Sequence, residues 1–241
     1  MSSVPTGNPD HDRGAREASR NATNRRERPG PPKRTGPPST DASAHDIVTC
    51  TDPPPPPGAS PWARLPESGA IEVARYDPAW PATATDLIAR IRGALGARAL
   101  DETHVGSTSV PGLPAKPIID VDLVVAYPGD EPGWLPPLER AGFVLTIREP
   151  WWHEHRLVKS RAPMANIHVF GPESPETWKH RVFRDWLRAN PSDRDEYAAV
   201  KLDAAAISTR RRESVMAYND RKAHIIHAIY GRAFRAAGLL A

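Results

Sequence analysis

Cysteine is nearly absent from this chain of 241 residues, since Cys50 is the only one. A single cysteine excludes an internal disulfide and a cluster of thiolate metal ligands. Long apolar runs are also missing, and the beginning of the chain is too polar for a signal peptide, so we expect no membrane span and a cytoplasmic location. The formal net charge is only +3, and charge alone therefore does not indicate nucleic-acid binding.

Aromatic residues are missing from the first part of the chain, where Trp62 is the first one. That part is rich in proline, with 12 of the 28 prolines within residues 1–60, and it carries charges of both signs. A segment of this composition buries too little apolar surface to fold. We therefore predict a disordered tail over 1–60, with no identified partner, which can be removed without loss of folding or ligand binding. Residues 61–241 then form one domain.

Periodicity predicts a mixed α/β half after this tail. Apolar residues at helical spacing indicate a helix over 80–95 that ends near Gly96. Segments rich in β-branched or aromatic residues and bounded by glycine and proline indicate strands. They are residues 103–105, 117–125, 143–147, 155–159 and 166–170, with a helix near 131–141 between the second and third.

A helical half follows Gly171. Apolar spacing predicts a helix around 178–187 and a longer one over 215–234. Between them, Ser192 and Asp195 resemble a capping box that opens a helix running to about residue 207. The predicted fold class is therefore α+β, with a small mixed β-sheet followed by a C-terminal helical region.

Two aspartates stand within an unusually apolar strand, in the sequence ProIleIleAspValAspLeuValVal at 117–125. Residues two apart on a strand point the same way, so Asp120 and Asp122 lie on one face while their apolar neighbours face the core. Two close carboxylates repel each other by roughly 3 kcal/mol, and a divalent cation would reverse this penalty. The pair therefore predicts an oxygen-ligand site for Mg²⁺ or Mn²⁺.

A glycine-serine turn precedes this pair by twelve residues. Gly106 lets the backbone approach a ligand closely, and the amides and hydroxyls of Ser107 and Thr108 can hold phosphate oxygens. Lys116 can add a positive charge, although a lone loop lysine is more often solvated. Phosphate and metal would then meet at one site.

This arrangement resembles the nucleotidyltransferase superfamily of DNA polymerase β, in which Gly-Ser is followed by Asp-x-Asp on a strand. The longer segments GSTSVPGLPAKPIID, HEHRL, NIHVF, FRDWLR and YDPAW are similar to the GrpB family, over about residues 71–235. The resemblance implies a nucleotidyltransferase core. In some bacteria a similar domain is joined to a dephospho-coenzyme A kinase, but the resemblance implies no particular substrate.

The resemblance also implies a third carboxylate, which this chain lacks at the matching strand. Asn166 stands where that aspartate is expected, with His168 on the same face. Asn166 can ligate a metal through its carbonyl but cannot take a proton, whereas His168 is either the general base or a hydrogen-bonded histidine of a half-buried strand. Glu154 is a second candidate for the missing carboxylate.

Several other polar residues leave alternatives open. His153 and His155 form a His-x-His pair, but no third zinc ligand stands at a suitable spacing. The arginines are either phosphate contacts or rim and ion-pair residues, and the same ambiguity holds for a tyrosine and a lysine four residues apart. These residues are Arg148, Arg156, Arg184, Arg188, Tyr218 and Lys222.

Three functions remain at this stage. The first is a metal-dependent enzyme that moves a nucleoside monophosphate from a nucleoside triphosphate to a small-molecule acceptor. The second is a nucleotide- or coenzyme-binding accessory module whose catalysis has lapsed, which Asn166 favours; the third is an interaction protein that uses its tail and aromatic helices. For the enzyme we expect Mg²⁺ or Mn²⁺ and the following roles: catalysis by Asp120, Asp122 and His168, phosphate binding by Gly106, Ser107, Thr108 and Lys116, and metal binding by Asp120, Asp122 and Asn166.

Overall fold

A computed structural model describes residues 47–49, 53–65 and 71–240 of the chain. Five strands and two helices make up the first half, and three long helices follow. The strands are β1 (Asp101–Val105), β2 (Ile119–Val124), β3 (Val144–Glu149), β4 (His155–Arg161) and β5 (Met164–Phe170). The helices are α2 (Trp80–Leu95), α3 (Glu131–Arg140), α4 (Pro175–Ala189), α5 (Pro191–Arg211) and α6 (Val215–Ala236), with short 3-10 turns η1 (Gly96–Arg98) and η2 (Ser107–Ser109).

These elements confirm the predicted strands and helices, with shifts of a few residues at their ends. The predicted capping box is wrong, because α5 begins at Pro191 and not after Ser192. Its N-cap residue Asn190 makes no side-chain capping bond. Proline suits the first helical position because its missing N–H would have no intrahelical partner there.

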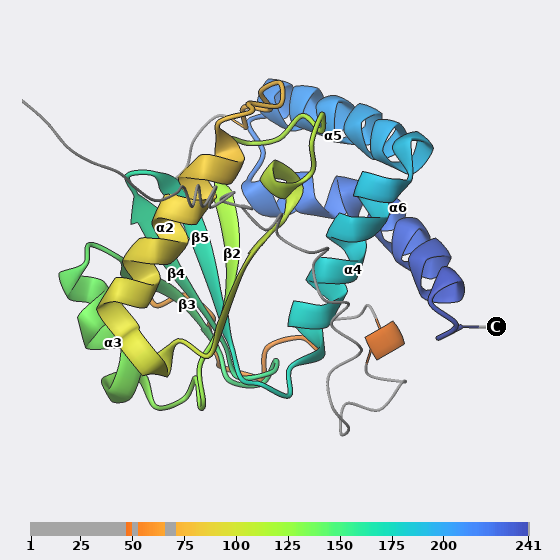
Figure 1. The fold of residues 1–241 in the computed structure, drawn as a ribbon. Coiled ribbons are helices and arrows are strands. Elements are labelled where there is room, and N and C mark those ends of the chain that lie inside the picture. Colours follow the sequence, from red (N-terminus) through yellow and green to blue (C-terminus); the bar gives the residue numbers. More distant parts are fainter. Residues whose placement is uncertain (1–46, 50–52, 66–70, 241) are drawn as a thin grey trace, which may run out of the picture. The chain divides into compact units, whose positions relative to one another are not determined.

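The five strands form one mixed sheet in the order β1-β2-β5-β4-β3. The central strands β2 and β5 are parallel, whereas every other neighbouring pair is antiparallel. Helices α2 and α3 lie on one side of this sheet and α4, α5 and α6 on the other (Figure 1). This arrangement confirms the predicted α+β class.

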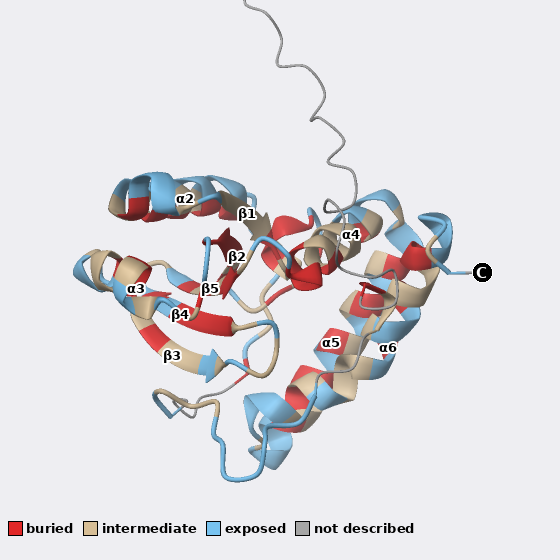
Figure 2. Ribbon diagram, turned by 90° about the horizontal axis from the view of Figure 1, so that it is seen from below, coloured by how far each residue is buried: buried red, intermediate tan, exposed pale blue. Residues whose placement is uncertain are grey.

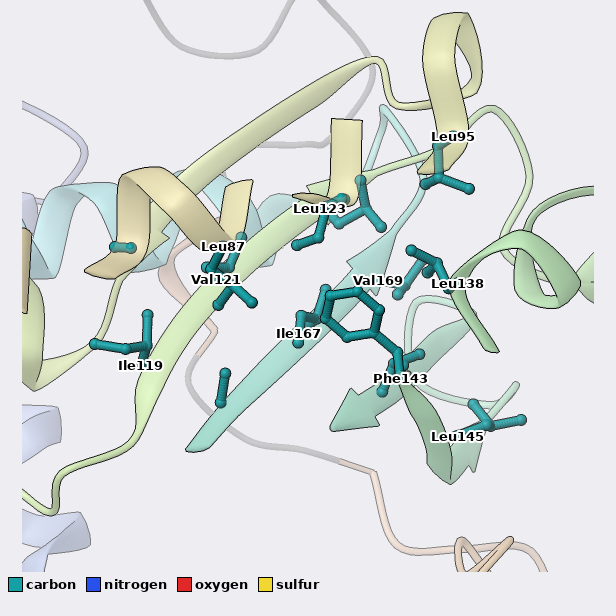
Figure 3. Close-up of a cluster of buried hydrophobic side chains, with 14 of the residues drawn as sticks. Leu87, Leu95, Ile119, Val121, Leu123, Leu138, Phe143, Leu145, Ile167 and Val169 are labelled. Atoms are coloured by element: carbon teal, nitrogen blue, oxygen red, sulfur yellow. The ribbon is translucent and has the colours of Figure 1, made fainter. Parts of the chain in front are cut away.

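The main hydrophobic core lies between the sheet and helices α2 and α3 (Figure 3). Alternate residues of β2, namely Ile119, Val121 and Leu123, are buried there at 2% exposure or less. Ile167 and Val169 of β5 continue the same surface. Because successive strand residues point to opposite faces, Asp120 and Asp122 must project from the other face.

The opposite face is covered by α4, α5 and α6, whose buried residues form a second apolar cluster (Figure 2). Leu187 of α4, Tyr197 of α5 and Ile229 of α6 meet there. Val110 and Leu113, from the connection between η2 and β2, complete the cluster. The helical half is thus packed against the loop that precedes the acidic strand.

Segments before α2 also contact the domain. The amides of Ala63 and Arg64 donate to the carbonyl of Thr146 on edge strand β3. Ile47 is buried, and Lys179 of α4 donates to the carbonyl of Thr49 over 2.7 Å. The boundary at residue 60 stays a prediction, but Ile47 and Thr49 lie on its N-terminal side. Residues 1–46 lie outside the described residues. No helix within the described ranges is both long and apolar enough to cross a membrane.

Candidate functional site

The parallel pairing of β2 and β5 brings four of the predicted site residues together. Asp120 is paired with Asn166, and Asp122 with His168. All four side chains lie on the face opposite the main core, because Val121 and Ile167 between them point into that core. The strands therefore present two carboxylates, an amide and an imidazole in two adjacent rows.

Gly106 lies directly against this group. Val105 is paired with Asp120 in the antiparallel β1–β2 ladder, so the turn begins beside the carboxylate. Gly106 has a φ of +67°, and a Cβ at this position would overlap the Asp120 side chain. Both the backbone conformation and the close approach require glycine. This contact explains physically why a glycine turn precedes the acidic strand.

Asp120 is held by neutral and positive neighbours. Asn166 Nδ2 donates to Asp120 Oδ1 over 2.9 Å, and His168 Nε2 lies 3.8 Å from the same oxygen. Burial by itself raises the pKa of Asp120, but His168, Asn166 and Lys116 outweigh it and hold the pKa below its usual value. Asp120 is thus ionised at neutral pH.

Asp122 is almost completely buried, at 1% exposure. Its charge is balanced by His180 of α4, whose Nδ1 lies 2.9 Å from Oδ1 and 3.1 Å from Oδ2. Burial lowers the pKa of His180, but Asp122, together with Glu176 and Asp120, outweighs burial and raises the pKa to about 9. His180 is therefore an imidazolium at neutral pH, which relieves the repulsion that the sequence predicted between the aspartates.

His168 is the end of a chain of hydrogen bonds. Its Nδ1 lies 3.2 Å from Nε2 of His155, and Nδ1 of His155 lies 2.7 Å from Oε2 of Glu149. Burial, and after it His168 and His180, lower the pKa of His155 well below its usual value, so His155 is neutral. Through His155, the carboxylate of Glu149 is linked to His168.

The residues before β4 take no part in this chain. Glu154 lies in the turn between β3 and β4, where its carboxylate is 3.5 Å from Arg156. His153 lies in the same turn and is exposed, so it does not share the face of His155. Both residues have positive φ values, 50° for His153 and 53° for Glu154. The suggested His-x-His face is wrong because the strand begins only at His155.

The hydroxyls of the turn differ in their surroundings. Thr108 is buried, and its Oγ1 is bonded to His104 Nε2 over 2.9 Å, so this hydroxyl is engaged within the protein. Ser107 is half-buried and bonded to the Tyr197 hydroxyl of α5. Thr108 therefore secures the turn, whereas Ser107 lies toward the helical half.

Three lysines converge on the side of Asp120 that faces the helices. Lys116 Nζ is 5.5 Å from the centre of the Tyr218 ring, and Lys222 Nζ is 4.6 Å from the same centre. Lys201 Nζ is 5.1 Å from the Tyr197 ring and is buried. The predicted residue Lys116 is thus joined by two lysines of α5 and α6.

The arginines mentioned above serve the framework of the protein. Arg148 and Arg156 both pair with Glu131 at the start of α3. Arg184 donates to the carbonyl of His104 and Arg188 to that of Ser109, so α4 is bound to β1 and the turn. These contacts favour the ion-pair and framework alternatives over phosphate contacts.

The carboxylates of Asp120 and Asp122 are the oxygen donors that a divalent cation would need. Within the described ranges, no group of three or more His, Cys, Asp or Glu side chains is arranged to hold a metal ion. The two carboxylates are nevertheless the hard oxygen donors that Mg²⁺ and Mn²⁺ prefer, and Mg²⁺ usually keeps several waters or substrate oxygens beside one or two carboxylates. The donor set therefore fits a cation shared between the protein and its substrate.

Cavities elsewhere are separate from this site. One of about 240 Å³ is lined by Trp151, Trp152 and Lys179 among others. A second, of about 280 Å³, lies beside Tyr127 and Ser174. Neither cavity is lined by Asp120, Asp122 or the three lysines.

Sequence reasoning missed His180, Glu149 and Lys201. His180 is 58 residues from Asp122 in the sequence, so no local pattern indicates their contact. Lys201 did leave a signal, because Tyr197-x-x-x-Lys201 repeats the spacing of Tyr218-x-x-x-Lys222 on the next helix.

The chain is similar to several known proteins. The chain is 48% identical over 168 residues to UPF0157 protein BH1888 of Halalkalibacterium halodurans, across 70% of this chain and 85% of that protein. It is 39% identical over 168 residues to UPF0157 protein SCO7215 of Streptomyces coelicolor, across 70% and 87%. A weaker similarity, 32% over 155 residues, links 53% of this chain to 38% of the dephospho-CoA kinase of Mycolicibacterium paratuberculosis.

A solved structure and a family model give the same result. The crystal structure of the conserved protein GrpB from Enterococcus faecalis is similar with a TM-score of 0.59 and 25% identity, over 69% of this chain and 99% of that one. The family model described as GrpB protein matches residues 70–232, which include both aspartates and all three lysines. The chain belongs to the GrpB family.

Proposed function

We propose that this protein transfers a nucleoside monophosphate from a nucleoside triphosphate to a small-molecule acceptor. The observation that carries the proposal is the contact between Gly106 and Asp120. A phosphate-binding turn and an acidic strand are thereby held against each other, as a site for a metal-bound polyphosphate requires. A purely structural role does not explain two aspartates on one strand face beside such a turn.

Asp120, Asp122 and Asn166 are the residues that would hold Mg²⁺ or Mn²⁺. When bound, the cation supplies positive charge that stabilises the oxygens of the phosphate undergoing transfer. The carboxylate of Asp120 is ionised in the free protein and is partly exposed. Asp122 is already balanced by His180, so Asp120 carries the unbalanced negative charge of the pair.

The chain's own residues also place the phosphates and the proton. Ser107 and Lys116 lie beside Asp120 and serve the leaving phosphates. Glu149 accepts the Nδ1 proton of His155, so Nε2 of His155 accepts from Nδ1 of His168. In the free protein His168 helps to balance the Asp120 carboxylate, and a bound cation would take over that role. Nε2 of His168 would then be left to take a proton from the acceptor.

The proposed reaction is balanced with these groups. The acceptor oxygen forms a bond to the α-phosphorus, the bond from that phosphorus to the bridging oxygen of the β-phosphate breaks, and pyrophosphate leaves. The acceptor proton moves to His168 Nε2. Proton transfer to a positioned side chain of this kind typically contributes about 10²- to 10⁴-fold to the rate.

A second function is favoured by a specific observation. Asp122 has His180 as a full partner, and the position expected for a third carboxylate holds Asn166. An accessory module that binds a nucleotide or coenzyme without transferring it has these properties. Because of the partial similarity to a dephospho-CoA kinase, coenzyme precursors are among the ligands to test.

The test measures pyrophosphate release from each of the four nucleoside triphosphates with Mg²⁺ or Mn²⁺. The acceptor panel contains phosphopantetheine-type compounds, sugars and other small hydroxyl compounds. We expect release by the parent and none by Asp120→Asn, with thermal shift as the parallel measure of nucleotide binding.

Binding without release by the parent would favour the accessory module. In that case Asn166→Asp, which restores a third carboxylate, is expected to introduce slow hydrolysis or transfer. Absence of any nucleotide effect on the unfolding midpoint, with either cation, would contradict both functions.

A further inference from the structure

The three lysines beside Asp120 have an arrangement that a structural role does not explain. Lys116 precedes β2, Lys201 belongs to α5 and Lys222 to α6, so three separate segments bring their ammonium groups together. Lys116 and Lys222 contact the same ring, that of Tyr218. Like charges at such a spacing repel each other unless an anion lies between them.

The positive charge of this group is opposed by the Asp120 carboxylate but by no direct ion pair. Within the described part of the chain, none of the three lysines forms a salt bridge, whereas the buried Lys179 elsewhere is paired with Glu176 over 2.5 Å. Lys201 is 2% exposed and donates to the carbonyl of Pro114 over 2.5 Å. A buried ammonium without a carboxylate is costly, and it is therefore expected mainly where a ligand supplies the charge.

The lysines also lie next to the glycine-serine turn. Tyr197 bonds to Ser107, and Lys201 lies one helical turn further along α5 with its ammonium 5.1 Å from the Tyr197 ring. The Asp120 carboxylate acts electrostatically on all three lysines. The cluster thus extends the proposed phosphate site away from the sheet and toward the helices.

We propose that Lys116, Lys201 and Lys222 bind a chain of two or more linked phosphates, such as the end of a nucleoside triphosphate. The inference rests on the proposed function for the location of the nucleotide and adds the part of the ligand that the helical half recognises. Three ammonium groups match the several negative charges of linked phosphates, whereas one phosphate group carries a charge of only about −1.5 to −2 at neutral pH. The burial of Lys201 favours a small ligand over the backbone of a duplex.

The protonation of the cluster supports this ligand. Burial, and after it Lys222, lowers the pKa of Lys201 to about 7, while burial and Lys116 lower that of Lys222 to about 8. The Asp120 carboxylate opposes these shifts. Burial and the charge of Lys159 lower the pKa of Lys116, again against Asp120. The Tyr197 and Tyr218 hydroxyls are neutral, because burial raises their pKa. A bound polyanion favours the charged lysines, so binding takes up protons and weakens as the pH rises through 7 to 8.

The experiment is calorimetric titration of the full chain, without divalent cation, with tripolyphosphate, pyrophosphate, orthophosphate and ATP. We expect tripolyphosphate to bind about tenfold or more tightly than orthophosphate, and ATP to compete with it. Lys201→Met and Lys222→Gln are each expected to weaken tripolyphosphate binding by about tenfold to a hundredfold. Lys179→Met, a buried lysine outside the cluster, is the matched control and should keep the affinity.

The outcomes separate this inference from the proposed function. If the two lysine variants lose tripolyphosphate binding while no transfer is ever seen, the phosphate site stands and the transfer reaction falls. If the parent releases pyrophosphate but both variants bind tripolyphosphate as it does, the inference is overturned. Equal binding of orthophosphate and tripolyphosphate, or no binding of either, also overturns the inference. If Lys201→Met fails to fold, Lys222→Gln provides the test, because Lys222 is only half-buried.

Discussion

Ile167 and His168 are neighbours in β5 and lie on opposite faces of the sheet. Ile167 is fully buried among apolar residues of β2, α2 and α3, all of which follow local periodic patterns. His168 lies among polar groups, between His155 of the next strand and Asp120 of β2. The apolar face thus follows the alternation of the sequence, whereas the polar face depends on particular side-chain partners. Substitutions on the polar face should therefore lower activity, and those on the apolar face should lower stability.

The largest effect is expected on the polar face. His168→Ala should lower the rate of nucleotidyl transfer by about 10²- to 10⁴-fold, the usual contribution of a general base, because Nε2 is the proton acceptor. Nucleotide binding should persist, since His168 is not among the proposed phosphate contacts. The measurement is the initial rate of pyrophosphate release at saturating nucleotide.

His227→Ala, at an exposed position of α6, is the matched control. It removes an imidazole that has no part in the proposed site and should leave the rate unchanged. A His168→Ala variant as fast as this control would show that His168 has only a structural role.

On the apolar face the expected loss is one of stability. Ile167→Ala should lower the free energy of unfolding by about 2–5 kcal/mol, because it leaves a cavity between β5 and α2. Denaturant unfolding measures this, with Met164→Ala on the same strand as control, since Met164 is 54% exposed. A stable Ile167→Ala variant that nevertheless lost transfer would erase the distinction between the two faces.

The same distinction explains how far the sequence predicts the structure. Alternating Ile119, Val121 and Leu123 identified β2 and its buried face, and the spacing from Gly106 to Asp120 identified the turn beside it. The partner of Asp122 was not predicted, because His180 reaches Asp122 across 58 residues and through the packing of α4 on the sheet. The capping box failed for a local reason, since Pro191 already begins the helix.

A smaller effect should follow from removing the residues before the predicted boundary. A chain that begins at Ser60 lacks buried Ile47 and the Thr49 carbonyl that accepts from Lys179. Loss of one buried aliphatic side chain should cost about 1.5–3 kcal/mol of unfolding free energy while nucleotide binding persists. Ile47→Ala in the full chain should reproduce part of this loss. An unchanged unfolding free energy in both proteins would place the domain boundary at residue 60, as the sequence predicts.

The smallest effect concerns the buried charge of Lys201, and it depends on pH. The pKa of Lys201 is lowered in the folded protein from 10.5 to about 7, because burial disfavours the charged form. The unfolded chain therefore binds more protons between these two values, so the cost of burying Lys201 is fully present below pH 7 and disappears as the pH approaches 10.5.

Lys201→Met removes this cost and fills a similar volume. Without ligand, the variant should melt about 2–4 °C above the parent at pH 6.5, which corresponds to about 1 kcal/mol in a chain of this size. The difference should shrink as the pH rises toward 10, because the parent lysine then becomes neutral in both states. Comparing the two proteins at each pH cancels the opposite dependence that His180 contributes, since both retain His180. A difference in melting temperature that stays constant, or that grows with pH, would show that Lys201 is not a charge held at a cost in the free protein.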